Sequence, residues 1–199
     1  MTKIPFVGLH AHSGLSLNDG LGYPQDHMDF AYENDGDALA LTDHGHMNGL
    51  PYQVLHAKKM RANGKKFKPI FGVEAYFNPS LEQWREEYEK AKQEKKRGIK
   101  NEIELSIEDE KASKQKAVDI LKKRNHLILL AQNQTGLNNI FKLISESYKD
   151  ENFYRYPRID YELLSLHNSG VIASSACLGG VYAGDYWDYR DFGGDAVLD

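Results

Sequence analysis

Short apolar runs alternate with segments of helical spacing along most of this chain. Residues 6–9 form the first run, and the segment after it places Met28, Ala31 and Tyr32 at the spacing of inward positions on a helix. Residues 38–41 form a second run, which is apolar throughout. This order of strand, helix and strand predicts an α/β fold with a mostly parallel sheet.

Three further strands are predicted at residues 68–77, 126–131 and 170–173, again separated by helical segments. In parallel sheets, ligands and catalytic groups gather beyond the carboxyl ends of the strands. His126 instead opens its strand, so this rule alone would place it at the opposite end of the sheet. The polar residues at or just after predicted strand ends are His10, His44, Glu74 and Cys177.

Capping residues predict where several helices begin and end. The helix after the second run is predicted to start near Asn48 and to stop at Gly64, where Asn63-Gly64 supplies a left-handed cap. Thr135 and Asp160 are the predicted N-caps of two later helices. The first of these two helices carries an apolar stripe of Leu137, Ile140, Phe141 and Ile144.

Residues 81–124 differ from the rest because Glu and Lys dominate and large apolar residues are few. We expect a solvated helical insertion within one domain that spans residues 1–199. The cations of the insertion could instead form a DNA-contacting arm, but the interleaved acidic residues favour a solvated face. The last residues, 186–199, end while a new helix is starting, so we expect the chain to stop before its fold is complete.

Composition limits the cell compartment and the partners. Hydrophobic residues make up 41% and charged residues 27%, and no apolar run approaches the ~20 residues that span a bilayer. The start lacks the features of a signal peptide, and one cysteine cannot form an internal disulfide, so we expect a cytoplasmic protein. A net charge of −4 argues against a surface that binds DNA everywhere, so any DNA contact must be local.

Two histidines share one face of an extended segment near the N-terminus. His10-Ala11-His12 places both imidazoles on the same side, because alternate residues of a strand share a face, and both can then bind one metal ion. On the residues alone, a solvated or hydrogen-bonded pair is an equal alternative. Asp19 follows in an Asn-Asp-Gly sequence, which an ordinary turn also explains.

A second cluster follows the second apolar run. Asp43, His44 and His46 emerge together at a strand end, and Gly45 allows the backbone to turn sharply. One neighbour is expected to orient a metal-bound histidine, with His46 as a spare. Glu74 lies in an otherwise apolar strand, where a buried carboxylate needs a partner, and a bridging position between two cations would supply one.

Cys177 has two interpretations: a small buried hydrophobe, or a thiolate metal ligand after a strand. Imidazoles, carboxylates and one thiolate together suit Zn²⁺, Mn²⁺ or Fe²⁺ better than Mg²⁺ or Ca²⁺, which prefer oxygen ligands. The chemistry that such a cluster favours is phosphoester hydrolysis.

Seven stretches, taken in order, resemble the PHP (polymerase and histidinol phosphatase) domain of bacterial-type, C-family DNA polymerase III alpha subunits. Each motif is weak alone, but the ordered set is highly specific, and it covers nearly the whole chain except the insertion. The stretches are residues 9–13, 18–20, 41–45, 68–76, 126–131, 157–160 and 175–179.

The resemblance implies a distorted (β/α)7 barrel that holds up to three divalent metal ions, Zn, Mn or Fe, at its strand ends. The family's late Asp-x-His pair of ligands does not occur after Cys177, so we expect the barrel and its metal site to be incomplete at the C-terminus. Catalytic roles fall on His12, His44 and Glu74. The metal ligands that the resemblance implies are His10, His12, Asp19, His44, Glu74, His126 and Cys177.

Three functions remain open from the sequence. The first is a metal-dependent phosphoesterase or 3′-5′ exonuclease site in a replicative polymerase, with the primer 3′ terminus of DNA, the other polymerase domains and replisome subunits as partners. The second is a metal-stabilised structural module that supports the polymerase or binds a proofreading subunit. The third is a free-standing PHP phosphatase, against which the polymerase-like stretches at residues 135–148 and 157–160 count.

Overall fold

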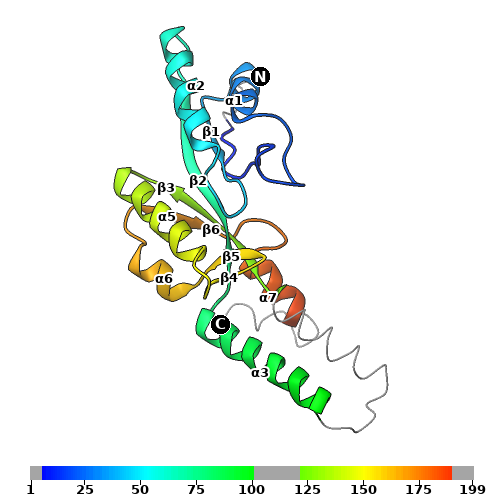
Figure 1. Cartoon of the computed structure of the whole chain (residues 1–199). Helices are drawn as coiled ribbons and strands as arrows, with labels where there is room; N and C mark the ends of the chain where they lie inside the picture. The colour runs from blue at the N-terminus through cyan, green and yellow to red at the C-terminus, as the bar shows by residue number, and fades with distance from the viewer. Residues whose placement is uncertain (1–5, 101–121, 190–199) are drawn as a thin grey trace.

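A computed structural model of the chain describes residues 6–100 and 122–189 and has the predicted α/β class (Figure 1). The strands are β1 (Ala38–Leu41), β2 (Lys68–Phe77), β3 (Asn125–Ala131), β4 (Phe153–Tyr154), β5 (Tyr156–Ile159) and β6 (Val171–Ser174). The helices are α1 (Pro24–Glu33), α2 (Leu50–Ala62), α3 (Leu81–Lys100), α5 (Gln134–Ser147), α6 (Tyr161–Leu166) and α7 (Val181–Tyr189).

The long strand β2 is the axis of one mixed sheet. The six strands have the linear order β4-β5-β2-β3-β6, and β1 pairs with the first part of β2. This mixed sheet with helices packed against it agrees with the α/β class that the sequence implied. Strands β1 and β5 run parallel to β2, whereas β3 runs antiparallel to β2 and to β6.

The antiparallel direction of β3 contradicts the mostly parallel sheet predicted from the sequence. A parallel neighbour requires a crossover helix that packs back along the sheet. Instead, α3 leaves the end of β2 and extends away from the sheet (Figure 1). The described chain re-enters near the end where β2 stopped, so β3 runs back along β2, with Tyr76 paired to His126.

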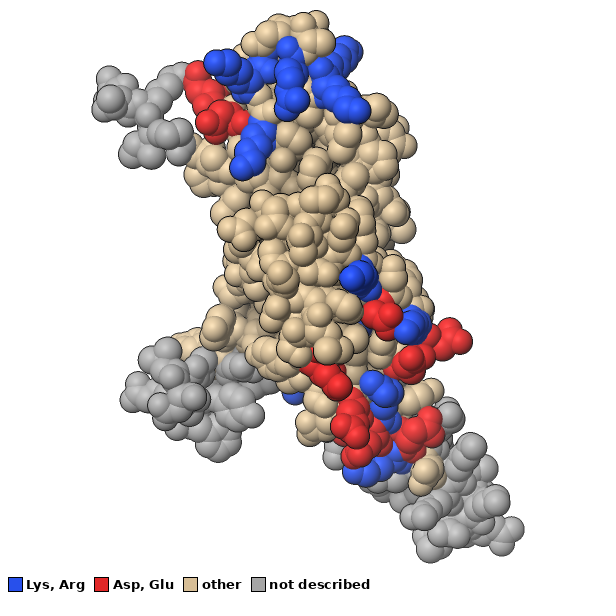
Figure 2. All heavy atoms as spheres, turned by 90° about the vertical axis from the view of Figure 1, so that its left-hand side faces the viewer, with Lys and Arg blue, Asp and Glu red and all other residues tan. Residues whose placement is uncertain are grey.

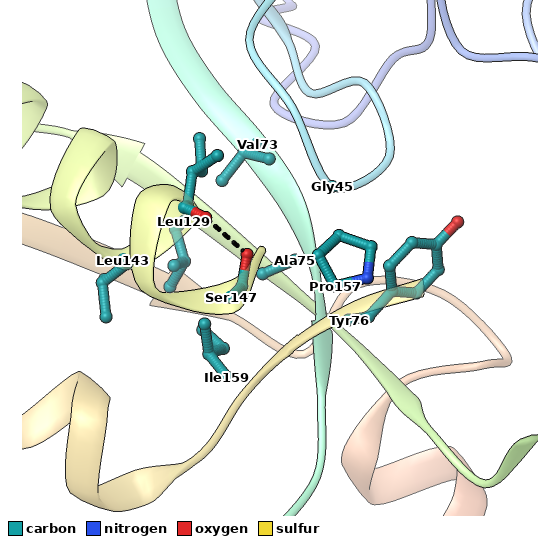
Figure 3. Close-up of a pocket in the computed structure, with 10 residues that line it drawn as sticks. Gly45, Val73, Ala75, Tyr76, Leu129, Leu143, Ser147, Pro157 and Ile159 are labelled. Atoms are coloured by element: carbon teal, nitrogen blue, oxygen red, sulfur yellow. Dashed lines mark hydrogen bonds between the residues drawn. The ribbon is translucent and has the colours of Figure 1, made fainter. Parts of the chain in front are cut away.

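Strand alternation gives β2 two different faces. Val73, Ala75 and Phe77 point to the core that α5 covers with Ile140 and Leu143. Figure 3 shows the small cavity left in this packing, lined mainly by apolar side chains, with the hydroxyl of Ser147 donating to a backbone carbonyl of its own helix. Its volume of about 10 Å³ is room for one water at most. The even-numbered residues of β2, Glu74 among them, point to the opposite face.

The remaining helices follow the sequence closely. Met28 is buried against α2, with Ala31 and Tyr32 packed beside it, as predicted. The apolar stripe of α5 is confirmed at Ile140, whereas Phe141 is 41% exposed. Its position on the helix turns Phe141 away from β2, and Leu143 is buried in that core instead.

Helix ends agree within two residues. Asp160 caps α6 as predicted, accepting a hydrogen bond from the backbone N–H of Leu163. Asn133, and not Thr135, caps α5, because its side-chain oxygen reaches the backbone N–H of Gly136 at 3.0 Å. Helix α2 begins two residues after Asn48 and ends before Gly64, whose φ of 75° is the predicted left-handed conformation.

The first apolar run does not form a regular strand. Residues 6–9 make a single bridge between Gly8 and Leu39, and the chain beside β1 adds hydrogen bonds from Ala40 N to Gly8 O and from Thr42 N to Ala11 O. Phe6 is 81% exposed. The segment is extended, but within the described chain it pairs with β1 on one side only. These backbone hydrogen bonds are too few to form a regular strand.

The insertion predicted to be solvated is anchored at its start. Leu81 and Trp84 of α3 are buried and pack with Tyr88 and Tyr154. The guanidinium of Arg158 lies 4.6 Å from the centre of a Trp84 ring. One apolar face thus anchors the first turns of α3, while the charged residues Glu82, Arg85 and Glu86 are exposed. Residues 101–121 lie outside the described part. Within the described ranges, no helix is both long and apolar enough to cross a membrane.

Candidate metal centre

Four chain segments bring imidazoles and carboxylates to one face of the sheet. His10 and His12 lie on the extended segment beside the end of β1, and His44 follows β1 itself. A backbone bridge joins His44 to Glu74: Glu74 N donates to Asp43 O, and Gly45 N donates to Glu74 O. Three groups of side chains have ligand atoms within 4.8 Å of one another; they are His10-His12-Glu74, His12-Asp19-His44 and His44-Glu74-His126.

Glu74 is the centre of this arrangement and is completely buried. Its Oε2 lies 2.8 Å from Nε2 of His10 and 2.8 Å from Nε2 of His12, and these two nitrogens are 2.9 Å apart. Two ligand atoms that each lie about 2.1 Å from one metal ion, with a ligand–metal–ligand angle near 90°, are roughly 3 Å apart. The three atoms therefore have the mutual spacing of ligands around one cation.

The other carboxylate oxygen of Glu74 faces the opposite direction along the site. Its Oε1 lies 2.9 Å from Nδ1 of His126 and 3.8 Å from Sγ of Cys177, and these last two atoms are 3.6 Å apart. One carboxylate thus contacts imidazoles with both oxygens. This is the arrangement that the sequence interpretation of a bridging Glu74 requires.

Asp19 closes a third side of the centre. Its Oδ2 lies 3.1 Å from Nε2 of His44 and 3.4 Å from Nδ1 of His12, and the rings of these two histidines stack with centroids 4.6 Å apart. The Asn-Asp-Gly sequence also forms a turn, with Asn18 at a φ of 65°. Asp19 therefore lies in a turn, as its sequence predicted, and the turn also directs its carboxylate toward the histidines.

The reversed direction of β3 explains the position of His126. A histidine that opens a parallel strand would lie at the far end of the sheet. Because β3 is antiparallel, its first residues lie beside the carboxyl end of β2, and the alternation that points Glu74 to this face points His126 to the same face. Cys177 follows β6 and is exposed, so its interpretation as a buried hydrophobe is wrong.

The electrostatic environment keeps the Glu74 carboxylate charged and shifts the pKa values of His12 and His44 in opposite directions. Burial would raise the pKa of Glu74, but hydrogen bonds with His12 and His126 outweigh it and hold the pKa well below the usual range. Burial alone would lower the pKa of His12, but the hydrogen bond with Glu74 and its negative charge raise this pKa above its usual value. At His44, burial prevails and lowers the pKa. An ionised carboxylate and neutral imidazole are the protonation states that bind metal ions.

Two buried imidazole nitrogens also indicate that this cluster can hold divalent cations. Nδ1 of His12 and Nδ1 of His44 are buried and make no hydrogen bond within the described structure, although they lie 3.4 Å from Asp19 Oδ2 and 3.6 Å from Glu74 Oε2, respectively. Buried polar nitrogens are rarely left without a partner. A cluster of imidazole nitrogens, carboxylate oxygens and one sulfur suits the borderline cations Zn²⁺, Mn²⁺ and Fe²⁺.

Two neighbours predicted near the ligands play other parts. Asp43 belongs to none of the three groups and accepts hydrogen bonds from the backbone N–H and the hydroxyl of Ser13, at 2.7 and 2.8 Å. This pair fixes the loop that carries His12. His46 belongs to none of the three groups, and its Nδ1 accepts a 3.4 Å hydrogen bond from Asn48 N, in agreement with its interpretation as a spare.

Sequence reasoning missed Tyr76, which lies two residues after Glu74 and therefore on the same face of β2. Its ring stacks on His44 with centroids 5.4 Å apart and meets His126 edge-on at 5.6 Å. The two-residue spacing was the signal that could have revealed it. Arg124, whose guanidinium lies 5.2 Å from the Tyr76 ring centre, had no such signal because it precedes its strand.

Comparison with known families gives a direct result: the model of the PHP domain matches residues 8–184. The chain belongs to the PHP domain family. PHP domains are a family of metal-dependent hydrolases, which agrees with the ligand cluster around Glu74. The family resemblance inferred from the ordered motifs is thus confirmed, while the ligand role of each residue stays a prediction.

Curated relatives that align with most of this chain are named DNA polymerase III subunit alpha. The protein of Treponema pallidum is 34% identical over 180 residues, which are 90% of this chain and 12% of that protein. Those of Aquifex aeolicus and Thermus aquaticus are each 36% identical, over 88% and 89% of this chain. The chain spans about 12% of the length of these relatives.

Among solved structures, an amidohydrolase from Chromobacterium violaceum is similar with a TM-score of 0.37 and 17% sequence identity. The likeness covers 70% of this chain and 34% of that chain.

Proposed function

We propose that this chain is the PHP domain of a replicative DNA polymerase III alpha subunit and that its centre hydrolyses phosphoesters as a 3′-5′ exonuclease at the primer terminus. The observation that carries the proposal is the convergence of four imidazoles on the buried carboxylate of Glu74, with both carboxylate oxygens in use. The relatives' names supply the polymerase context.

The metal ligands in this proposal are divided by the two oxygens of Glu74. His10 and His12 share one oxygen, while His126 and Cys177 face the other, and Asp19 with His44 completes the set. Bound divalent ions would activate a water and neutralise charge that develops on phosphoryl oxygens.

The chain's own residues prepare this site in three ways. Glu74 remains ionised in a buried place, so it balances cationic charge without solvent. His44 stays neutral because burial lowers its pKa, which leaves a nitrogen lone pair available. Asp43 holds the loop of His12 through Ser13, so that His12 keeps its position before any ligand arrives. We assign the catalytic roles to His12, His44 and Glu74.

Metal content and nucleotide release test the proposal together. The chain would be analysed for bound metal and for Mn²⁺-dependent release of nucleotides from a 3′-mismatched primer. His12→Ala is expected to abolish release and reduce bound metal. His46→Ala is the matched control, since His46 lies in the same region but outside the cluster, and it should retain both.

The same experiment separates the catalytic role from a structural one. Metal binding that raises the unfolding temperature, with no nucleotide release above that of His12→Ala, would show a module that supports the polymerase. Release that persists in purified His12→Ala would instead point to a contaminating nuclease and remove the support for the exonuclease assignment.

A further inference from the structure

Arg124 carries a charge that the described structure leaves without an acidic partner. Its guanidinium carbon lies 3.9 Å from the centre of the Tyr156 ring and 5.2 Å from that of Tyr76. Nη1 donates to the carbonyl of Lys122 at 3.1 Å. Nε is buried and has no hydrogen-bond acceptor. The guanidinium is therefore oriented by aromatic faces and retains unused donors.

The ring of Tyr76 connects Arg124 to the metal centre. One side chain contacts the guanidinium, stacks on the imidazole of His44 and meets the imidazole of His126 edge-on. The two carboxylates nearest to these histidines, Glu74 and Asp19, are already engaged with imidazoles. Arg124 is thus linked to the centre through the Tyr76 ring, and the described structure pairs its charge with neither carboxylate.

A second guanidinium strengthens the positive potential at this place. Arg158 is completely buried and donates to the carbonyls of Tyr154 and Tyr156. Burial lowers the pKa of Arg158 to about 10, and the nearby charge of Arg124 contributes to that shift. Two arginines held close to each other favour an anion at the more accessible one. Arg124 is the more exposed of the two.

We propose that Arg124 binds the phosphoryl oxygens of the phosphoester presented to the metal centre and thereby selects anionic ester substrates. The planar guanidinium offers paired N–H donors that match two phosphoryl oxygens. Stacking on Tyr156 fixes its plane before the anion arrives, which reduces the entropy lost on binding. This inference deepens the proposed hydrolytic function and rests on it for the identity of the substrate.

A purely structural role for Arg124 makes a different prediction. If the side chain only packs on Tyr76 and Tyr156, a methionine of similar length would preserve its contribution, and a lysine would offer no special advantage. If it binds phosphate, the charge matters more than the packing. Lysine would then recover part of the binding, while methionine would lose it.

Phosphate binding to the metal-free chain tests the inference without relying on hydrolysis. The probe is inorganic phosphate, with its dissociation constant measured by ³¹P NMR or calorimetry in wild type, Arg124→Met and Arg124→Lys. Loss of one charge-assisted, bidentate contact should weaken phosphate binding about tenfold in Arg124→Met, with part of the loss recovered in Arg124→Lys. Arg61→Met, at the exposed end of α2, is the control and should match wild type.

Steady-state kinetics on the Mn²⁺-loaded chain provide the second readout. With a p-nitrophenyl ester of thymidine monophosphate, Arg124→Met should raise KM about tenfold and leave kcat within about twofold, because the lost contact exists before and during reaction. Equal phosphate affinity in wild type and Arg124→Met would overturn the inference while leaving hydrolysis intact. Lost phosphate affinity in a chain that hydrolyses no ester would keep the binding site and reject the proposed function. If Arg124→Met does not fold, Arg124→Gln, which removes the charge but keeps a polar side chain, takes its place, and unchanged phosphate affinity and KM in that variant overturn the inference.

Discussion

At the scale of single residues, Glu74 determines whether the centre can exist. A buried carboxylate without partners would be protonated or destabilising. Here the imidazoles of His10, His12 and His126 surround it, and each of them is itself half-buried. Removing the carboxylate charge would leave a cluster of imidazoles with no common anion, so metal affinity should depend on Glu74 more than on any single histidine.

Glu74→Gln tests this dependence because it keeps the shape and removes the charge. We expect metal affinity, measured by calorimetry with Mn²⁺, to fall more than tenfold, and metal-dependent hydrolysis to be lost. Glu146→Gln serves as control, since Glu146 pairs with Lys149 at the surface. Equal metal affinity in the two variants would contradict a central role for Glu74.

Gly45 shows how a backbone position supports a ligand. Its φ is 70°, and a Cβ there would lie 3.0 Å from Pro157 Cγ and 3.3 Å from the Tyr76 ring. Gly64 has nearly the same φ, 75°, with open space around it. Gly64→Ala therefore reports the backbone strain alone, and Gly45→Ala reports strain plus contact, so the two form a matched pair.

Urea unfolding of the two glycine variants gives a clear comparison. Gly64→Ala should cost about 1 kcal/mol, and Gly45→Ala about 2 kcal/mol or more, because the contact with Pro157 adds to the strained φ. Displacement of His44 should also weaken metal binding in Gly45→Ala only. Equal costs would show that the loop of Gly45 moves freely to accommodate a methyl group.

At the scale of elements, the sequence predicted most strands and helices but not the direction of one strand. Periodicity placed β2 at residues 68–77 without error, and capping chemistry located α6 through Asp160. The direction of β3 depends on how the insertion leaves the sheet, which local pattern does not encode. For the same reason, spacing along the sequence could not show that His126 lies beside Glu74. It also could not show that Arg124 lies against Tyr76.

The start of α3 offers a test of what anchors the insertion. Trp84 is 5% exposed and lies against the guanidinium of Arg158, whereas Tyr88, one turn later, packs only partly against the same cluster. Trp84→Ala should lower the free energy of unfolding by about 3 kcal/mol, and Tyr88→Ala by about 1 kcal/mol. Because β5 carries Arg158 and pairs with β2, we expect the larger loss to expose β5 to hydrogen exchange. Equal costs for both variants would mean that the helix is held elsewhere.

At the scale of the whole molecule, charge is unevenly distributed despite the net charge of −4. The sequence contains no Asp or Glu between His44 and Val73, while Lys58, Lys59 and Arg61 lie close together at the end of α2. Figure 2 shows Lys and Arg side chains gathered at one end of the molecule, with mixed charges at the other. A local basic surface is what the sequence required of any DNA contact.

This basic surface should contribute to DNA affinity but not to the chemistry at the centre. Its three residues lie about 12 to 17 Å from the start of α2, given the rise of 1.5 Å per residue along the helix, so we expect them to contact DNA phosphates away from the centre. The triple change of Lys58, Lys59 and Arg61 to Gln should weaken binding of single-stranded DNA and reduce the slope of affinity against salt by about two to three. Turnover of the small thymidine ester should be unchanged. Lys149→Gln, which removes a cation already paired with Glu146, is the control. A triple variant with an unchanged salt slope would place the DNA contact elsewhere, and one that slowed the small ester would show that α2 acts on the centre directly.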